Sequence, residues 1–279
     1  QASGMLVPAL TETDEILLNE RFRWQQEMGV RVERLSAAQI HKLEPALDGP
    51  IRWGLWWPQS AQVNPVQLVA AYGKLIQQQG GKLLTRTPVR RFLLEGDKVV
   101  GLETHEGALR ADWVVNCAGA WSGFDSGLPL SIPMVPVKGQ LLQFTCQEPL
   151  FHHLIKSPLG YLVQRDKHTL LAGTTVEKVG YNKEVTDEGV AAIQTTAQAL
   201  SSEVESLKLS HSWAGLRPGT PDGLPLLGPT PLKRFLLATG HSRNGILLAP
   251  LSGRLIADRI TETPGSLDWT PFQVSRFMA

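Results

Sequence analysis

The sequence has few cysteines, no excess of charge of either sign and no apolar run of bilayer length. Only Cys117 and Cys146 occur, without CxxC spacing, which argues against a disulfide framework or a zinc site and predicts core thiols in a reducing compartment. The 27 basic and 26 acidic residues nearly balance, so neither nucleic acid nor an anionic membrane is expected as the main partner. The lack of an integral membrane segment or a leader pattern predicts a cytoplasmic protein.

Three familiar catalytic or binding patterns are also missing. The glycine fingerprint G-x-G-x-x-G, which seats a dinucleotide pyrophosphate at a helix N-terminus, occurs nowhere in the chain, and this argues against a flavin or nicotinamide cofactor. In Gly119–Gly123 the serine stands one place late for a nucleophile elbow. His152, His153 and His168 have no carboxylate or cysteine at metal-ligand spacing, so we expect no metal.

What is present is a mixture of helical and strand patterns. Apolar periodicity and capping residues predict helices over 16–26, 36–43, 66–79, 187–200 and from about 248 onward. Apolar runs between turn residues predict strands over 82–84, 89–94, 99–104, 111–117, 138–144, 160–164, 169–173, 207–213 and 234–239. Strands that pair with helices stand at both ends of the chain, around an antiparallel-looking block. We therefore predict an α/β fold (α+β overall), a doubly wound domain interleaved with an antiparallel-sheet domain.

The segment Gly240–Leu247 joins the last predicted strand to the last predicted helix. A helix N-terminus presents unpaired backbone N–H groups and a partial positive charge, so this loop is suited to an anion or an electron-rich ring. A plain strand-to-helix crossover explains the same pattern, and the loop alone does not separate the two interpretations.

Arg217 is the side chain that the sequence singles out as a ligand. It follows an apolar stretch and precedes Pro218-Gly219, which predicts a partly buried and rigid guanidinium. A planar guanidinium matches a carboxylate with two hydrogen bonds, so Arg217 is a candidate clamp for an acid substrate, with an interdomain salt bridge as the alternative. Tyr161, on a predicted strand, is a candidate phenolic partner for that carboxylate or a packing residue.

Five stretches together resemble the glycine oxidase branch of the D-amino-acid oxidase family of flavoenzymes, the type associated with thiazole and thiamine biosynthesis. The resemblance extends from about Gly4 to Trp269, and its last two motifs are the specific ones. The stretches are Ala2–Pro8, Val114–Ser122, Pro136–Gln140, Trp213–Gly223 and Gly240–Pro250.

The resemblance implies FAD as cofactor and assigns roles residue by residue. It implies that Arg217 binds the substrate carboxylate, with Tyr161, Arg243 and Met5 beside the substrate. Backbone N–H groups of the Gly240–Leu247 loop would stabilise negative charge on the reduced flavin. The implied cofactor contacts are Gly4, Met5, Val89, Ala118, Gly119, Trp121, Gly240, His241, Arg243, Asn244, Gly245, Ile246 and Leu247.

The resemblance also implies a division of the chain. Residues 1–15, 62–125 and 214–279 correspond to the FAD-binding domain, and residues 16–61 and 126–213 to the substrate-binding domain. The family begins with a strand and a glycine-rich turn that hold the pyrophosphate, and this sequence starts after them. We expect either a fragment whose missing unit lies elsewhere or impaired FAD binding.

The implied reaction is oxidative deamination of glycine, sarcosine or a small D-amino acid, with O2 as acceptor and hydrogen peroxide as product. One alternative is an amine dehydrogenase of the same fold that uses another acceptor. A second is a flavin-free, non-catalytic subunit or fragment that binds a partner chain. A flavin domain acting on tRNA is disfavoured by the even charge balance. A homo-oligomer is compatible with all of these interpretations.

Overall fold

The computed structural model describes residues 3–124, 127–158, 160–263, 265 and 267–278. Residues 1 and 2, including Ala2 of the Ala2–Pro8 motif, lie outside this part. The chain divides into a first unit of residues 1–68, 139–177 and 183–215, and a second unit of residues 69–138, 178–182 and 216–279. Within the described residues, no helix has the length and apolar character required to span a bilayer.

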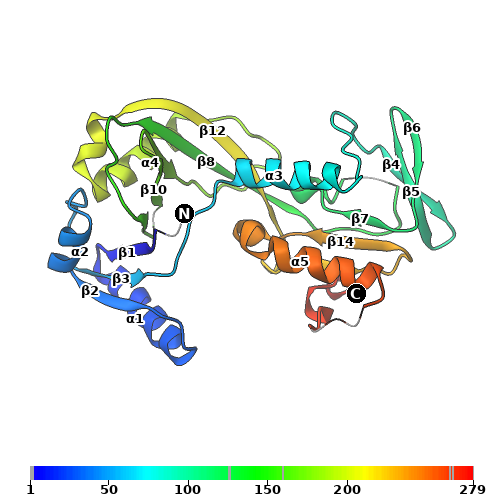
Figure 1. The fold of residues 1–279 in the computed structure, drawn as a ribbon, viewed down its shortest axis with the longest axis horizontal. Helices are drawn as coiled ribbons and strands as arrows, with labels where there is room; N and C mark the ends of the chain where they lie inside the picture. Colours follow the sequence, from blue (N-terminus) through cyan, green and yellow to red (C-terminus); the bar gives the residue numbers. More distant parts are fainter. Residues whose placement is uncertain (1–2, 125–126, 159, 264, 266, 279) are drawn as a thin grey trace. The chain divides into compact units, whose positions relative to one another are not determined.

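The first unit is built on one large, mainly antiparallel sheet (Figure 1). Its strand order is β12-β8-β11-β10-β9-β1-β3-β2, and β1 pairs with β9 in parallel. The boundaries between the two units fall within β8 and β12, so both strands contribute residues to each unit. The strands are β1 (Met5–Ala9), β2 (Glu33–Ser36), β3 (Trp53–Trp57), β8 (Val135–Thr145), β9 (Leu154–Lys156), β10 (Tyr161–Asp166), β11 (Thr169–Gly173) and β12 (Lys208–Gly219).

Three helices belong entirely to the first unit, and each begins at a side-chain cap. They are α1 (Glu12–Glu27), α2 (Ala37–Leu43) and α4 (Asp187–Leu200). The caps are Thr11 for α1, Ser36 for α2 and Thr186 for α4, each accepting a hydrogen bond from a backbone N–H in the first turn. A short 3-10 turn, Ser202–Ser206, follows α4. Capping thus fixes where these helices begin, as the sequence predicted for α2.

A buried carboxylate joins α2 to the start of β9. Glu44 is fully buried and accepts backbone hydrogen bonds from His152 (2.9 Å) and His153 (2.7 Å), while the Nδ1 atom of His153 lies 2.5 Å from its Oε1. Glu44 is therefore a carboxylate partner that spacing along the sequence does not reveal. Among the described residues, no group of three or more histidine, cysteine, aspartate or glutamate side chains is arranged to hold a metal ion.

The second unit contains two three-stranded sheets. One has the order β4-β5-β6 and is antiparallel, and the other has the order β13-β14-β7, with β14 and β7 parallel. The main hydrophobic core of the second unit includes Phe92, Val99, Phe235 and Val274. The elements are β4 (Arg91–Glu95), β5 (Lys98–Thr104), β6 (Gly107–Arg110), β7 (Val114–Asn116), β13 (Leu226–Pro229), β14 (Phe235–Thr239) and α5 (Gly245–Ile260), with 3-10 turns at Gly119–Trp121, Ser242–Asn244, Thr270–Phe272 and Val274–Phe277.

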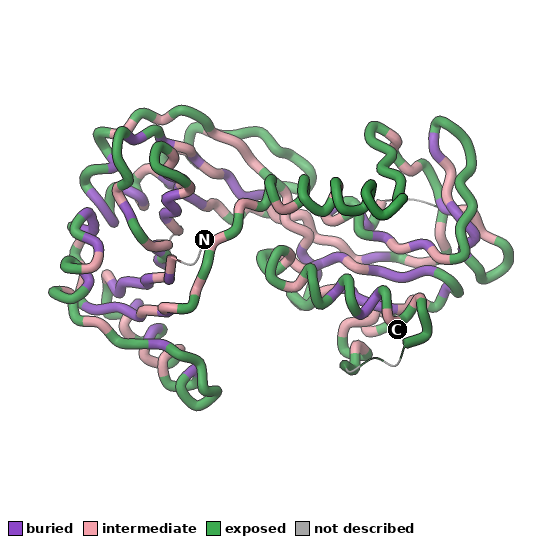
Figure 2. The backbone as a smooth tube through the Cα atoms, viewed as in Figure 1, coloured by how far each residue is buried: buried purple, intermediate pink, exposed green. Residues whose placement is uncertain are grey.

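Helix α3 (Pro65–Gln78) has an apolar face that the described residues leave exposed. Its cap is Asn64, whose Oδ1 accepts from Val66 N and Gln67 N, and Pro65 holds the first position, one residue before the predicted start of the helix. None of its residues is buried, and Figure 2 shows the helix as largely exposed. The exposed apolar side chains on it are Val66, Val69, Tyr72, Leu75 and Ile76.

The predicted mixed α/β fold with a large antiparallel sheet is confirmed, but three local predictions are wrong. No strand forms at Lys82–Leu84, because Leu83 and Leu84 are exposed and pair with no neighbouring strand in the described part of the chain. The predicted buried strand 111–117 narrows to β7. Of the two predicted core thiols only Cys146 is buried, since Cys117 lies just past β7 and is exposed.

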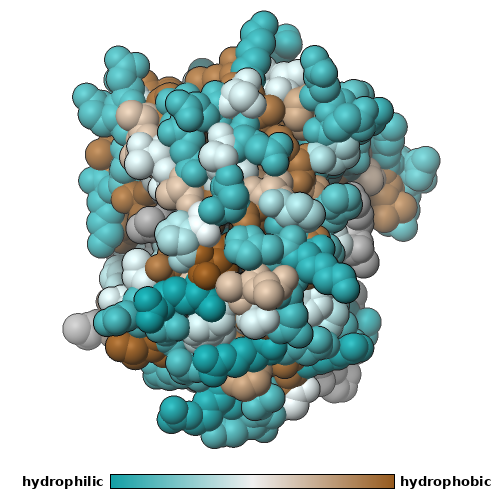
Figure 3. Space-filling model, turned by 90° about the vertical axis from the view of Figure 1, so that its left-hand side faces the viewer, coloured by the Kyte–Doolittle hydropathy of each residue, from teal (hydrophilic) through white to brown (hydrophobic). Residues whose placement is uncertain are grey.

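The surface of the first unit agrees with the balanced composition. Figure 3 shows mainly hydrophilic side chains on that side of the molecule, with apolar side chains scattered among them. The most exposed apolar residues of α1 are Ile16, Leu17 and Trp24. The predicted roles of the domains, cofactor binding and substrate binding, stay predictions. Residues 3–15 lie in the first unit, where β1 pairs with β3.

Candidate functional site

Two segments that the sequence predicted to contact the cofactor, residues 118–121 and Gly240–Leu247, follow the neighbouring parallel strands β7 and β14. Phe235 and Leu236 of β14 pair with Val114 and Val115 of β7. Because the carboxyl ends of parallel strands meet at the same edge of a sheet, the segment after β7 and the segment after β14 emerge together. Crevices at this edge are the usual ligand sites of open α/β sheets. The second unit therefore has one edge where both segments are available to a ligand.

Hydrogen bonds lock these two segments to each other. Ser122 Oγ donates to Thr239 Oγ1 (2.9 Å), and Thr239 Oγ1 donates to the carbonyl of Gly119 (3.1 Å). Asn116 accepts from Ala118 N (3.0 Å) through Oδ1. Ser122 and Thr239 are each 1% exposed, so this network lies within the protein interior. It fixes the backbone of Ala118–Trp121 relative to the end of β14.

The 3-10 turn after β7 carries an exposed aromatic ring. Gly119 has a φ of +58°, a left-handed conformation that glycine adopts without strain, and no atom lies within 4 Å of a Cβ built there. Trp121 is 48% exposed, and its ring lies 6.0 Å from that of Tyr181, whose hydroxyl donates to Ala120 O (3.1 Å). The turn thus offers open backbone beside an indole face.

The segment after β14 leads into a helix N-terminus without a side-chain cap. Gly240 (φ +73°) and Ser242 (φ +49°) turn the chain from β14 into α5. The N-cap residue Asn244 makes no side-chain hydrogen bond to the first turn of α5, although each of the other α-helices has such a cap. Ile246 and Leu247 in that first turn are exposed, Leu247 by 78%. Uncapped N–H groups beside exposed apolar side chains suit a flat, electron-rich ligand.

His241 is tied to the helix instead of being available for proton transfer. Its Nε2 atom lies 2.9 Å from the Oγ atom of Ser252, about two turns into α5. Burial lowers the pKa of His241 below its ordinary value, because the charged imidazolium is poorly solvated there. We therefore expect a neutral imidazole that fixes the loop to α5.

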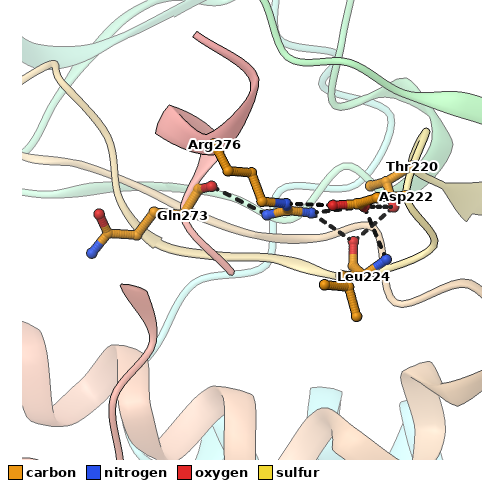
Figure 4. Close-up of polar contacts among 5 residues, drawn as sticks. All are labelled: Thr220, Asp222, Leu224, Gln273 and Arg276. Atoms are coloured by element: carbon orange, nitrogen blue, oxygen red, sulfur yellow. Dashed lines mark hydrogen bonds and ion pairs between the residues drawn. The ribbon is translucent and has the colours of Figure 1, made fainter. Parts of the chain in front are cut away.

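A closed turn supports Gly240 from the other side. A Cβ built at Gly240 would lie 2.8 Å from Thr220 Cγ2 and 3.0 Å from Leu226 N, so the turn that begins at Thr220 packs directly on this glycine. Asp222 organises the turn, accepting from Leu224 N (3.0 Å) and Thr220 Oγ1 (3.2 Å) through Oδ1. Figure 4 shows these contacts together with Arg276, which reaches Asp222 from the C-terminal segment.

The Asp222 carboxylate makes stability depend on acid pH. Hydrogen bonds from Arg276 lower the pKa of Asp222 to about 2, with further hydrogen bonds from Leu224 and Thr220. Since the folded-state pKa is below the unfolded one, the carboxylate stabilises the fold fully above about pH 4, and this contribution is lost as the pH falls toward 2. We expect about 1 kcal/mol after allowing for solvent screening. Urea unfolding of the wild type and of Asp222→Asn at about pH 7 and pH 3 checks this expectation. The difference between their free energies of unfolding should be smaller at the lower pH, and an equal difference at both pH values would contradict it.

Arg217 lies on β12 and not in a loop. The sequence predicted a strand that ends at residue 213, but β12 continues through Gly219. Arg217 is half-buried, and its Nη1 donates to the carbonyl of Lys138 at 3.4 Å. It stands three residues before Thr220, on the strand that enters the turn beneath Gly240. The predicted rigidity of Arg217 is thus supplied by a strand, and its contact with a substrate stays a prediction.

Three further predicted substrate and ring contacts, Gly4, Met5 and Tyr161, lie in the first unit. Gly4 (φ +72°) donates to Ser60 O (2.8 Å), and Met5 begins β1. Tyr161 begins β10, and its phenol covers Gly173, where an added Cβ would lie 3.0 Å from the hydroxyl oxygen. The sheet order β10-β9-β1 separates Tyr161 from Met5 by one strand. The common use of these residues with Arg217 stays a prediction.

Two further predicted contacts, Val89 and Arg243, lie in the second unit. Val89 precedes β4, in a different sheet from β7 and β14, so its predicted adenine contact stays a prediction. Arg243 is exposed, within the 3-10 turn that precedes α5. Sequence reasoning missed Asp222 as the organiser of the turn and missed Arg276 altogether. The only available signal for Asp222 was its place in the Trp213–Gly223 motif.

Comparison with known proteins assigns the fold and the family. Residues 1–259 match the family described as FAD dependent oxidoreductase. The chain is 33% identical over 256 residues to a glycine oxidase of Pseudomonas aeruginosa, covering 91% of this chain and 70% of that protein. It is 34% identical over 268 residues to a bifunctional protein ThiO/ThiG of a Nostoc species, with 91% and 40% covered.

A solved structure has a similar fold. The crystal structure of glycine oxidase from Geobacillus kaustophilus superposes with a TM-score of 0.94 at 29% identity, covering all of this chain and 76% of that one. This chain therefore spans between two fifths and about three quarters of the proteins compared here. The matched segments include the loop before α5, the turn after β7 and the strand of Arg217. The chain belongs to the FAD-dependent oxidoreductase family that includes the glycine oxidases.

Proposed function

We propose that the protein oxidises a small amino acid, such as glycine, sarcosine or a small D-amino acid, with FAD as cofactor. The imino acid formed hydrolyses to a keto acid and ammonia, or methylamine where the substrate is sarcosine, and dioxygen is reduced to hydrogen peroxide. The observation that carries the proposal is the uncapped N-terminus of α5, preceded by the Gly240 turn. Family membership makes FAD the cofactor, and the choice of amine and of electron acceptor is our inference.

The residues at this edge of the second unit fit a flavin ring. We infer that backbone N–H groups at Gly245–Leu247 face the electron-rich edge of the ring, where they would stabilise negative charge. The apolar side chains of Ile246 and Leu247 are exposed and available to cover its hydrocarbon parts. Ala118, Gly119 and Trp121 would then border the remainder of the cofactor, held in place by the Ser122–Thr239 network.

Arg217 is our candidate ligand for the substrate carboxylate. Its half-buried guanidinium is held by a strand and by the carbonyl of Lys138, so little side-chain entropy is lost on binding. A carboxylate held by two N–H groups fixes both the position and the orientation of the attached α-carbon. Tyr161 as a phenolic partner, and Arg243 and Met5 as neighbours of the substrate, remain predictions from the resemblance.

The chemistry that FAD supplies in such enzymes is two-electron oxidation of an amine to an imine. The protein then has to bind the substrate, orient it and exclude water. If the amine binds in its neutral form, no titrating base is required. His241 is consistent with this, because its imidazole is tied to Ser252 and stays neutral. We therefore expect the rate to follow the protonation of the free substrate amine.

Peroxide production tests the proposed reaction. The purified protein is supplied with FAD and assayed for hydrogen peroxide with glycine, sarcosine and D-alanine, in parallel with a dye acceptor under nitrogen. Peroxide formed in proportion to the amine consumed supports an oxidase. Turnover with the dye alone would replace the oxidase by a dehydrogenase. A protein that binds no FAD and oxidises none of these amines would contradict the proposed function and favour a non-catalytic chain.

A further inference from the structure

The C-terminal segment after α5 extends beyond residues 1–259, the part of the chain that matches the family. Its last 3-10 turn, Val274–Phe277, is anchored in the core of the second unit. Val274 is 1% exposed and packs in the same cluster as Leu226 and Phe235. Arg276 is therefore presented by an anchored backbone and not by a free terminus.

The guanidinium of Arg276 forms bidentate hydrogen bonds with the turn after β12. Nε donates to Asp222 Oδ2 (2.7 Å), and Nη2 donates to Asp222 Oδ1 (3.1 Å) and to the carbonyl of Leu224 (3.0 Å). Nη1 donates to Gln273 O (3.1 Å), within its own segment. All three nitrogens are used, and the side chain is only 17% exposed. Such a bidentate pair fixes geometry as well as charge.

Asp222 transmits this constraint to Thr220. The hydroxyl of Thr220, a residue that is 8% exposed, lies 3.2 Å from Asp222 Oδ1 and donates to Leu224 O at 2.7 Å. Arg276 and Thr220 therefore share two acceptors, Asp222 Oδ1 and the carbonyl of Leu224 (Figure 4). Loss of the guanidinium leaves both oxygens with fewer donors and loosens the turn.

The turn that begins at Thr220 packs against Gly240. The space that a Cβ would need at Gly240 is already occupied by Thr220 Cγ2 and Leu226 N. A shift of the turn by a few tenths of an ångström is therefore passed to Gly240, and so to the backbone that enters α5. No other residue type combines a φ of +73° with this close approach without strain.

We propose that Arg276 is a positioning residue for the cofactor: through Asp222 and Thr220 it holds the Gly240–Leu247 backbone in the conformation that receives the flavin ring. This rests on the proposed function, in which that loop faces FAD. It adds to it a residue outside the family match, 54 positions from Asp222 in the sequence. Arg276 acts through other residues and does not itself contact substrate or cofactor.

The test compares Arg276→Ala and Arg276→Lys with the control variant Arg254→Ala. Arg254 is an exposed residue of α5 that forms a salt bridge with Asp258, so the control also removes one positive charge and one salt bridge. Two properties are measured, the Kd for FAD by flavin fluorescence and amide hydrogen exchange of peptides covering 238–250 in the FAD-free protein. We expect Arg276→Ala to raise the Kd about tenfold and to speed exchange in those peptides about tenfold. Arg276→Lys, which keeps the charge but not the fork, should fall between, and Arg254→Ala should change neither.

The outcomes separate the two proposals. If the wild type binds no FAD, the proposed function fails, and the positioning role for the cofactor fails with it. If the wild type binds FAD but Arg276→Ala leaves both the Kd and the exchange rates unchanged, only the role of Arg276 is overturned. A fall in global stability with unchanged exchange at 238–250 relative to the rest of the chain would also overturn it, because Arg276 would then be merely structural.

Discussion

Arg217→Ala is expected to raise KM for the amino acid about 100- to 1,000-fold while leaving the affinity for FAD unchanged. The physical reason is that a substrate carboxylate, taken out of water beside a half-buried guanidinium, loses its charged partner. Removal of one member of such a pair costs about 2–5 kcal/mol. Steady-state kinetics with glycine or sarcosine and a separate FAD titration measure the two quantities independently.

Arg217→Lys is the matched variant, because it keeps the positive charge and loses the planar fork. We expect its KM to lie between those of the wild type and Arg217→Ala. An unchanged KM in Arg217→Ala would remove this residue from substrate binding and favour a structural salt bridge. A loss of FAD binding in the same variant would also contradict the assignment, since Arg217 would then serve the fold or the cofactor.

Gly245→Ala should weaken FAD binding about 10- to 100-fold without lowering the free energy of unfolding. Gly245 begins α5 with ordinary helical angles, φ −56° and ψ −45°, and the atom nearest to an added Cβ is His241 Cβ at 3.7 Å. The protein itself thus tolerates a methyl group at this position. Alanine should even favour the helix. A flavin packed against this backbone would collide with the methyl group.

Gly253→Ala in the same helix provides the control. An added Cβ at Gly253 meets no atom within 4 Å, so the substitution should stabilise α5 by up to about 1 kcal/mol and leave FAD affinity unchanged. The two variants are compared by urea unfolding of the FAD-free protein and by fluorescence titration with FAD. Equal FAD affinity in Gly245→Ala and Gly253→Ala would mean that the start of α5 does not face the flavin.

The helices could be predicted from the sequence because their signals are local. Ser36 with Gln39, and Asn64 with Pro65, mark helix starts within a few residues, and the structure places α2 and α3 there. The strand predicted at Lys82–Leu84 has an equally apolar pattern, but within the described part of the chain it has no neighbouring strand to bury it. Strand formation depends on such neighbours, which no local pattern reveals.

The strand of Arg217 illustrates a different limit. Glycine and proline predict a loop, yet β12 runs through Pro218 to Gly219. Among the described strands, β12 lies at the edge of its sheet, and edge strands are where proline is found, because only one side of the strand is paired. Position in the sheet therefore overrides the local preference of the residues. The same applies to Cys117, whose exposure follows from where β7 ends.

The contacts that hold the turn against Gly240 could not be predicted from local sequence patterns. Asp222 and Arg276 are 54 residues apart, and their pairing follows from the docking of the C-terminal segment on the core through Val274. By contrast, the glycine at the end of β14 and the helix after it were visible in the sequence. The sequence thus predicted the elements of the cofactor edge but not the contacts that hold them.

Anaerobic mixing of the FAD-loaded protein with glycine or sarcosine is the most direct test of the central claim. We expect the amino acid to bleach the absorbance of the oxidised flavin, and Arg217→Ala to require about 100-fold more substrate for the same effect. Readmission of air should restore the absorbance and release hydrogen peroxide. A protein that holds FAD yet shows no bleaching with any small amino acid would not be an amino-acid oxidase.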